Sequence, residues 1–370
     1  MCWPDPSPQH EHTGIDPALP VCETRSSAVV ASGALWNTRL VQRIYLDQNK
    51  WIDLARARIG HELGKTYIAA YEAAKAAVEA GRASFPLSSA HYFETHKSAV
   101  AQRRVDLAHT MLELSRLDAI APPHVIVPYE IEAALIEVLG LANDPPQPLK
   151  VFGHGANHVH ATRMFTYTAP EEFEGHLLPT DLRNLVTVRG QTHLEIITLA
   201  DYPEFGNKRI QLNEHMRLTG TKFVYGQNTV RDRLGELGRH RLGDMMTATA
   251  IVDIVDPLLA TAERLAVDLE RLFDSGPALI TRFLEAMPSR WVEKELRRLR
   301  QSNPQKRWEG NDLNDVTALS IAVPYCDVVI TEGSWTAMIN NQKINRRFNT
   351  QVLRNLRELP DPDLLQAETV

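Results

Sequence analysis

The chain has few of the features that mark secreted, membrane-spanning or strongly basic proteins. It contains only three cysteines, Cys2, Cys22 and Cys326, and their wide spacing fits neither a disulfide framework nor a paired-cysteine zinc site. No apolar run is long enough to cross a membrane, and the N-terminus has no basic segment followed by an apolar one. We therefore expect a cytoplasmic protein that has no membrane partner.

An excess of positive charge is also absent. The formal net charge is −6, so any contact with nucleic acid must come from a local patch. Hydrophobic residues make up 44% of the chain, which is enough to fill an ordinary globular core. A length of 370 residues allows two domains, or one domain with a large insertion.

Short β-favouring runs alternate with helical patterns in the first part of the chain. Residues 41–46 favour a strand that ends at Asp47, and the apolar residues from Trp51 to Ala55 then follow at helical spacing. The other elements predicted here are a helix over 65–80, a strand over 83–87, a helix that begins at Ser88 or Ser89, a helix over 105–117 and a helix over 128–139. This order is typical of a mostly parallel sheet flanked by helices.

The pattern changes between residues 143 and 302. Polar loops are predicted first, followed by helical tracts over 245–272 and 278–300. The α/β pattern then resumes with a helix over 311–323, a strand over 326–331 and a helix over 335–344, while 350–356 has no clear period. The prediction is one α/β domain of residues 41–140 and 305–358, interrupted by a mainly helical insertion of residues 141–304, with a flexible arm of residues 1–40 and a tail of residues 359–370.

Acidic residues follow the predicted strands or begin the adjoining helices. Asp47 and Glu332 each come directly after a strand, Glu94 lies early in the helix after the second strand, and Asp312 and Asp315 begin a later helix. Ligands of parallel α/β sheets bind beyond the carboxyl ends of the strands, so these side chains are expected to face one edge. Clustered carboxylates repel one another unless a hard cation neutralises them. The sequence therefore predicts a Mg²⁺ or Mn²⁺ site suited to phosphodiester hydrolysis.

Three stretches resemble the PIN-like nucleases. Residues 44–52, Ile-Tyr-Leu-Asp-Gln-Asn-Lys-Trp-Ile, are similar to the family's first strand, its terminal aspartate and the following helix. Residues 311–332 are similar to its acidic helix and to the strand that ends in Thr and a last acid, which is Glu332 here where many members carry Asp. Residues 86–89 followed by Glu94 resemble the middle acidic position more loosely. The resemblance covers roughly residues 41–140 and 305–358.

The resemblance implies a PIN-like fold and a metal-dependent endoribonuclease. Asp47, Glu94, Asp315 and Glu332 would bind Mg²⁺ or Mn²⁺, with Asp312 supporting or joining them; whether Asp312 or Asp315 is the principal ligand stays open. RNA, single-stranded or structured, would be the substrate, as for most family members. Some members act on structured or flapped DNA, so the choice between RNA and DNA stays open. An inhibitory protein would be a further partner. The oligomeric state is left open.

A basic segment precedes the second α/β part. Its candidates for phosphate contact and base stacking are Arg297, Arg298, Arg300, Lys306, Arg307 and Trp308. A solvated amphipathic helix explains the same charges equally well.

Ordinary structural roles exist for each candidate ligand. Asp47 and Asp312 suit helix N-caps, Asp315 suits the first turn of a helix, and Glu94 suits a solvent-facing position. Glu130 is a weaker sixth candidate. The histidines His154, His158 and His160 are a further candidate set for zinc or phosphate, although their spacing favours a polar surface loop.

Two other functions compete with the nuclease. One is a catalytically inactive PIN-like scaffold that binds RNA or a protein partner through the insertion. The other is an aspartyl-phosphate hydrolase with Asp47 as the nucleophile. The second is disfavoured because Asn49 stands where such enzymes place a second aspartate.

Overall fold

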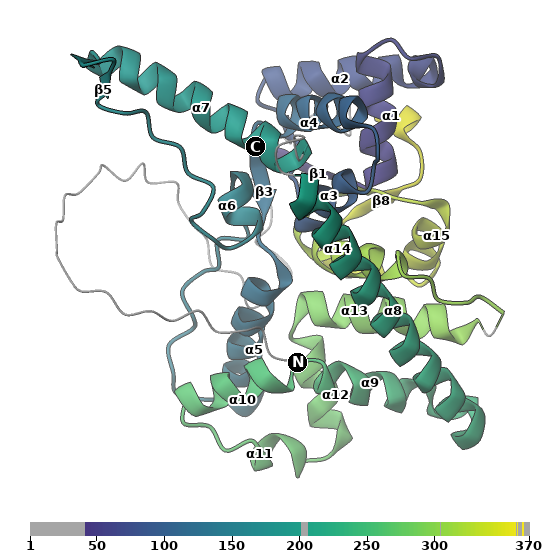
Figure 1. The fold of residues 1–370 in the computed structure, drawn as a ribbon. Helices are drawn as coiled ribbons and strands as arrows, with labels where there is room; N and C mark the ends of the chain where they lie inside the picture. Colours follow the sequence, from purple (N-terminus) through teal and green to yellow (C-terminus); the bar gives the residue numbers. More distant parts are fainter. Residues whose placement is uncertain (1–40, 201–205, 304, 360, 362–364, 366–370) are drawn as a thin grey trace.

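The computed structural model of the chain describes residues 41–200, 206–303, 305–359, 361 and 365. The predicted N-terminal arm of residues 1–40 lies outside the described residues, as does most of the predicted tail. Figure 1 shows the described chain as a small sheet with helices on both sides and a large helical region beside it.

A four-stranded parallel sheet forms the centre of the fold. Its strand order is β2-β1-β7-β8, and each neighbouring pair is parallel. The strands are β1 (Gln42–Leu46), β2 (Ala83–Ser84), β7 (Val328–Ile330) and β8 (Gln351–Leu353). The two central strands, β1 and β7, thus come from opposite ends of the described chain. This confirms the predicted α/β class with a parallel sheet flanked by helices.

Two antiparallel ribbons accompany the sheet. They consist of β3 (Asp118–Ile120) with β4 (Phe152–His154) and β5 (Glu172–Phe173) with β6 (His176–Leu177). Leu87, just after β2, forms a parallel bridge with Ala119, so the β3–β4 ribbon lies beside the β2 edge of the sheet. β3 was not predicted, because three residues between a helix and two prolines carry too little pattern to identify a strand.

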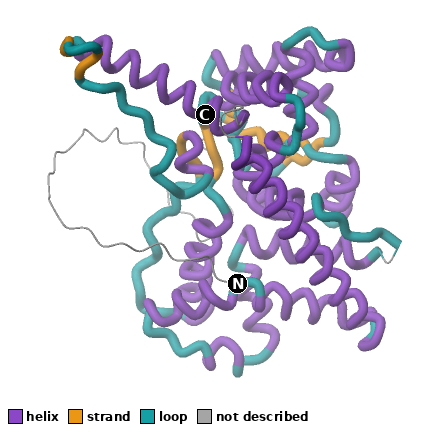
Figure 2. Tube along the Cα trace, viewed as in Figure 1, coloured by secondary structure: helices purple, strands orange, loops and turns teal. Residues whose placement is uncertain are grey.

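Helices make up most of the described chain, as Figure 2 shows. The α-helices are α1 (Gln48–Arg58), α2 (Ile68–Glu79), α3 (Ser89–His96), α4 (Ala101–Ser115), α5 (Pro123–Leu139), α6 (Gly155–Val159), α7 (Thr180–Ala200), α8 (Gly206–Leu237), α9 (Leu242–Val252), α10 (Val255–Arg264), α11 (Glu270–Phe273), α12 (Pro277–Glu285), α13 (Pro288–Ser302), α14 (Asp312–Tyr325) and α15 (Gly333–Asn341). Short 3₁₀ helices are η1 (Glu62–Tyr67), η3 (Arg239–Arg241), η4 (Ile344–Phe348) and η5 (Leu356–Glu358).

The alternation of side chains along the strands divides the core between the two faces of the sheet. Ile44 and Leu46 pack in one cluster with residues of α1, α2 and α4. Tyr45, between them, packs on the other face with residues of α13, α14 and α15. Both faces are therefore buried, as expected for a parallel sheet whose strands are apolar throughout.

The region between residues 143 and 302 differs most from the sequence prediction. α7 and α8, with 21 and 32 residues, lie where polar loops were predicted. α8 is polar around most of its circumference, so it lacks the broad apolar stripe from which a surface helix is recognised. The tract over 245–272 is divided among α9, α10 and α11, and the tract over 278–300 between α12 and α13.

A third apolar cluster joins the inserted helices to α5. Ile131 and Leu135 of α5 pack with Phe283 and Leu284 of α12 and with residues of α9 and α10. The inserted segment therefore shares a core with the helix that precedes it.

Within the described ranges, no single helix has both the length and the apolar composition needed to cross a membrane. One helix pair, Arg239–Val252 with Val255–Arg264, meets these two criteria jointly but is bent by 59°.

Burial of α1 against the sheet predicts a large difference between two leucine substitutions. Leu54 is 0% exposed, so Leu54→Ala should lower the free energy of unfolding by about 2–5 kcal/mol through lost burial and a cavity. Leu63, which is 63% exposed, is the matched control, and Leu63→Ala should change it by less than about 0.5 kcal/mol. Urea unfolding followed by circular dichroism measures both, and equal effects would contradict the packing of α1.

Candidate metal centre

Four acidic residues lie at the ends of β1 and β7 and on two helices beside them. Asp47 follows β1 and is the N-cap of α1, and Glu332 follows β7 as the N-cap residue of α15. Glu94 lies on α3 and Asp315 in the first turn of α14. The carboxyl ends of the two central strands therefore carry the acids that the sequence singled out.

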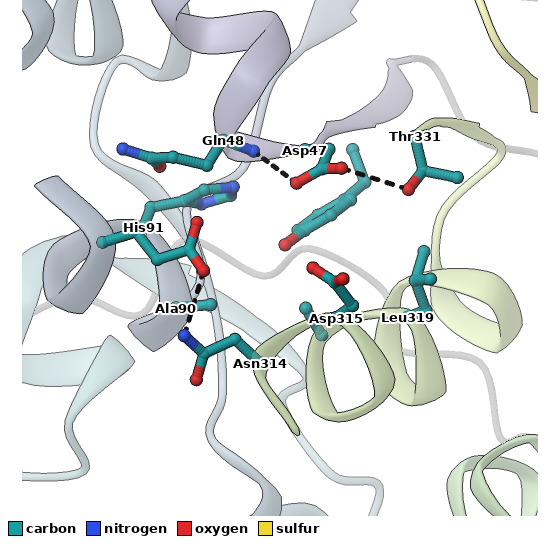
Figure 3. A pocket seen from close by; sticks show the side chains of 11 residues that line it. Asp47, Gln48, Ala90, His91, Asn314, Asp315, Leu319 and Thr331 are labelled. Carbon is teal, nitrogen blue, oxygen red and sulfur yellow. Dashed lines mark hydrogen bonds between the residues drawn. The ribbon is translucent and has the colours of Figure 1, made fainter. Parts of the chain in front are cut away.

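A small hollow separates three of these acids. Asp47, Glu94 and Asp315 all line it, together with Tyr45 and His91 among others. Figure 3 shows Asp47 and Asp315 directed toward this hollow from the strand end and from α14, respectively. Its volume is about 10 Å³, which is room for about one water-sized species.

Strand pairing fixes the position of Asp47. Leu46 pairs with Ile330, and the backbone N–H of Asp47 donates to the carbonyl of Ile330 at 2.9 Å. The backbone N–H of Gln48 donates to Asp47 Oδ1 at 2.7 Å, and Thr331 Oγ1 donates to Oδ2 at 3.2 Å. Asp47 is thus both a helix cap and a lining residue of the hollow, so the structural and functional interpretations of this residue are compatible.

Neutral donors contact the other three carboxylates, and Lys97 Nζ also lies 3.6 Å from Glu94 Oε1. Trp335 Nε1 donates to Asp315 Oδ2 at 3.0 Å, and Asn314 Nδ2 donates to Glu94 Oε1 at 3.0 Å. Asn49 Nδ2 donates to Glu332 Oε1 at 2.7 Å. Sequence reasoning missed these positioning residues, although two of the three were detectable as amides beside predicted ligands: Asn49 is two residues from Asp47, and Asn314 adjoins Asp315.

His91 ties α3 to the end of β1. Its Nδ1 accepts from the backbone N–H of Ser88 at 2.9 Å, and its Nε2 lies 2.8 Å from the carbonyl oxygen of Leu46. Burial lowers the pKa of His91 to about 4, so the ring is neutral at physiological pH. A neutral ring that accepts at Nδ1 carries its proton on Nε2, which matches the contact with Leu46. His91 therefore positions α3, and with it Glu94, next to Asp47.

Burial and mutual repulsion raise the pKa values of the two acids at the centre of the group. Burial, then the charge of Glu94, raises the pKa of Asp47 from 3.8 to about 6. Burial, then the charge of Asp47, raises the pKa of Asp315 from 3.8 to about 7, with further contributions from Glu94 and Glu332. Asp47 and Asp315 thus each lie within electrostatic reach of the other three acids.

The donor chemistry of this group fits a hard divalent cation. Such ions prefer carboxylate oxygens, and a cation in the hollow would offset both the burial of these charges and their mutual repulsion. No group of three or more His, Cys, Asp or Glu side chains in the described part of the chain is already arranged to hold a metal ion. The fit therefore lies in the negative charge, the oxygen donors and the space of the hollow.

Asp312 has a different environment from Asp315. Arg300 Nη2 donates to both of its carboxylate oxygens, at 2.8 and 2.6 Å, and the backbone N–H of Glu309 donates to Oδ2 at 2.7 Å. Asp312 and Arg300 are both buried, and Asp312 does not line the hollow. Of these two aspartates, the geometry favours Asp315 as the ligand and Asp312 as a support for the start of α14.

The basic segment is largely engaged within the protein. Arg297 pairs with Glu293 and Asp253, and Arg298 pairs with Glu295. The prediction that Arg300 and Trp308 contact nucleic acid from the surface is wrong, because each is only 4% exposed. Arg300 lies over the Trp308 ring, and Phe223 packs edge-on against it, so the indole is not free to stack on a base. Of the six predicted contacts, the exposed ones are Lys306 and Arg307.

Two weaker candidate sites also prove structural. The side chain of His160 packs among the rings of Tyr92, Phe93 and Phe165, while His154 is exposed, so the three histidines form no joint site. The buried Glu130 accepts from the backbone and side chain of Ser289 and from Tyr325 Oη, which joins α5 to α13 and α14.

Comparisons of the chain with protein families, with curated proteins and with solved structures find no match. The assignment of this centre therefore rests on the chemistry and placement of its own residues.

The raised pKa values predict that the acidic group destabilises the protein at high pH. Asp47 and Asp315 bind their protons more tightly in the folded protein than in the unfolded chain, because their pKa values are raised on folding. Their protonated forms therefore favour the folded state, fully below about pH 4, and this contribution to the free energy of unfolding is lost as pH rises through about 6 and 7. In the absence of divalent ions, Asp315→Asn should raise the free energy of unfolding at pH 8 by on the order of 1–2 kcal/mol and change it little at pH 4. Urea unfolding at the two pH values measures this.

The exposed Asp274, at the end of α11, provides the control. Asp274→Asn should have the same small effect at both pH values. A pH-independent effect of Asp315→Asn would show that its carboxylate is not strained by its neighbours.

The buried pair of Asp312 and Arg300 gives a prediction that separates Asp312 from Asp315. Asp312→Ala leaves the Arg300 guanidinium buried without its carboxylate, which should cost about 3–5 kcal/mol of unfolding free energy. The variant should still gain thermal stability from Mn²⁺, whereas Asp315→Asn should not. Melting temperatures with and without Mn²⁺ test both statements; loss of the Mn²⁺ effect in Asp312→Ala at a temperature where it is folded would make Asp312 a ligand.

Proposed function

We propose that the chain is a PIN-like, metal-dependent endoribonuclease that hydrolyses RNA phosphodiester bonds. The observation that carries the proposal is the gathering of Asp47, Glu94, Asp315 and Glu332 beyond the carboxyl ends of the central strands, where burial, together with mutual repulsion, raises the pKa values of Asp47 and Asp315. Perturbed carboxylates in a hollow at this edge of a parallel sheet are typical of functional sites.

Each of the four acids has a defined part in this proposal. Asp47 and Asp315 would hold Mg²⁺ or Mn²⁺, with Glu94 and Glu332 completing the oxygen donors. The ion supplies charge neutralisation at the scissile phosphate and lowers the pKa of an attacking water. Thr331 and the N-terminus of α1 fix the Asp47 oxygens, while Asn49 and Asn314 orient the two glutamates.

Asp315 keeps one carboxylate oxygen available. A bound cation would lower its pKa from the value of about 7 in the cation-free protein, so Asp315 would be ionised as a ligand. Trp335 occupies Oδ2, so Oδ1 is the oxygen that remains for an ion or a water.

The choice of RNA as substrate comes from the resemblance of residues 44–52 and 311–332 to the PIN-like nucleases. Lys306 and Arg307, exposed between α13 and α14, supply positive charge for phosphate contact at the surface. We place the enzyme in the cytoplasm on the low cysteine content of the sequence.

A catalytically inactive PIN-like scaffold that binds RNA or a protein is the second candidate. It is favoured by the observation that no three ligand side chains among the described residues are already arranged around a metal position. The two candidates differ in whether RNA is cleaved when a divalent ion is supplied.

The nuclease predicts cation-dependent cleavage that the central acids control. Purified protein should cut a labelled RNA in Mg²⁺ or Mn²⁺ and not in EDTA. Asp47→Asn and Asp315→Asn should each lower the rate by at least about 100-fold, since each removes a ligand charge while keeping an acceptor for Gln48 or Trp335. Asp274→Asn should cut at the parent rate. Gel analysis of the products measures all of these.

Cleavage that persists in EDTA, or in both asparagine variants, would exclude this mechanism. Binding of RNA with no cleavage under any divalent ion would favour the scaffold.

A further inference from the structure

A groove of about 650 Å³ lies between α8, the end of α3 and the loop of residues 308–311. α8 forms one wall and meets the loop in close backbone contact, since a Cβ atom on Gly220 would lie 3.1 Å from Gly310 Cα. α8 belongs to the inserted segment, so the insertion supplies one side of this groove. A volume in this range accommodates an organic ligand of about nucleotide size or larger.

The groove adjoins the acidic hollow. Asn314 lines both, and its amide holds Glu94. Lys97 lines the groove, donates to Asn311 Oδ1 at 2.9 Å and lies 3.6 Å from Glu94 Oε1. A chain that occupies the groove therefore passes directly beside the acids.

The lining of the groove combines apolar surface with positive charge. Met216 and Val224 contribute apolar side chains. Lys97 and Arg217 contribute cations, of which Arg217 is ion-paired with Glu214, and Glu309 is the acid among the lining residues. Unpaired nucleotides present apolar base faces together with phosphate charge, and sites for single strands combine the matching features. In a duplex the base faces are stacked and their edges paired, which leaves mainly phosphates and sugars to contact.

We propose that this groove binds a single-stranded segment of RNA next to the bond that is cut. This inference rests on the proposed nuclease function and adds to it the strandedness of the substrate and a role for the insertion. The inserted helix α8 thus selects unpaired nucleotides, while the acids at the sheet edge act on the backbone that follows.

Arg217 and Arg233 provide a matched pair of variants on α8. Both are exposed, and each forms an ion pair with an acid three residues away, Glu214 and Glu236 respectively. Arg217 lines the groove, whereas Arg233 does not. Binding of fluorescent single-stranded RNA to the full chain is measured by anisotropy in EDTA, so that cleavage does not interfere.

Arg217→Ala should weaken binding about 3- to 10-fold and lower the slope of log K against log salt concentration by about 1, as expected for one lost phosphate contact. Arg233→Ala should bind as the parent does. Thr221→Trp, which places a large side chain at an exposed position in the groove, should weaken binding at least as much without affecting the fold. The same RNA annealed to its complement should bind more weakly than the single strand.

The inference is overturned if Arg217→Ala and Thr221→Trp both bind single-stranded RNA as tightly as the parent protein does. It is also overturned if the duplex binds as tightly as the single strand. A DNA strand of the same sequence that binds more tightly than the RNA would also overturn the assignment to RNA. If groove variants weaken binding but no divalent ion supports cleavage, the groove stands and the nuclease proposal fails. If the protein cleaves RNA and the groove variants do not change binding, the nuclease proposal stands and the groove inference fails.

Discussion

The parallel pairing of β1 with β7 is the contact on which the acidic centre depends. The two strands are separated by more than 280 residues in sequence, yet Leu46 lies opposite Ile330, and the ladder continues to the backbone of Asp47. Parallel strands end at the same edge of a sheet, so this one register brings Asp47 and Glu332 together without any direct contact between them. If β1 shifted by one residue along β7, its side chains would exchange faces of the sheet. Tyr45 would then leave the cluster that it forms with α13, α14 and α15, and Ile44 and Leu46 would leave the cluster on the other face.

The partners of the acids determine how much charge remains for a ligand. Asp312 and Asp315 are three residues apart on one helix, but Asp312 is paired with the buried Arg300, while Asp315 meets only the neutral indole of Trp335 among its hydrogen-bond donors in the described structure. A cationic partner neutralises the charge of a carboxylate, whereas a neutral donor orients the carboxylate and leaves its charge in place. The protein therefore neutralises one acid to stabilise α14 and keeps the other repelled by its neighbours, which is a cost in stability that a cation would remove.

The sequence predicted the parts of this arrangement that are local. β1, α1 and α14 form close to the predicted ranges, because strand runs and helix starts are encoded by adjacent residues. The pairing of Arg300 with Asp312 was not predicted, since it requires α13 to turn back onto α14. Whether a basic residue faces solvent or a buried acid depends on tertiary packing, and the prediction of Arg300 as an RNA contact failed for this reason. α8 escaped prediction because its polar surface resembles a loop in composition.

The inserted helices support the centre instead of standing apart from it. α8 packs against α3 and α14, which carry Glu94 and Asp315, and α13 packs along α14 and supplies Arg300. Figure 1 shows α8 crossing in front of α14 in agreement with these contacts. A small sheet can position the two acids at its strand ends by itself, but the two helix-borne acids need a second layer that fixes their helices. The insertion provides that layer, and its helix α8 also lines the groove that adjoins the hollow.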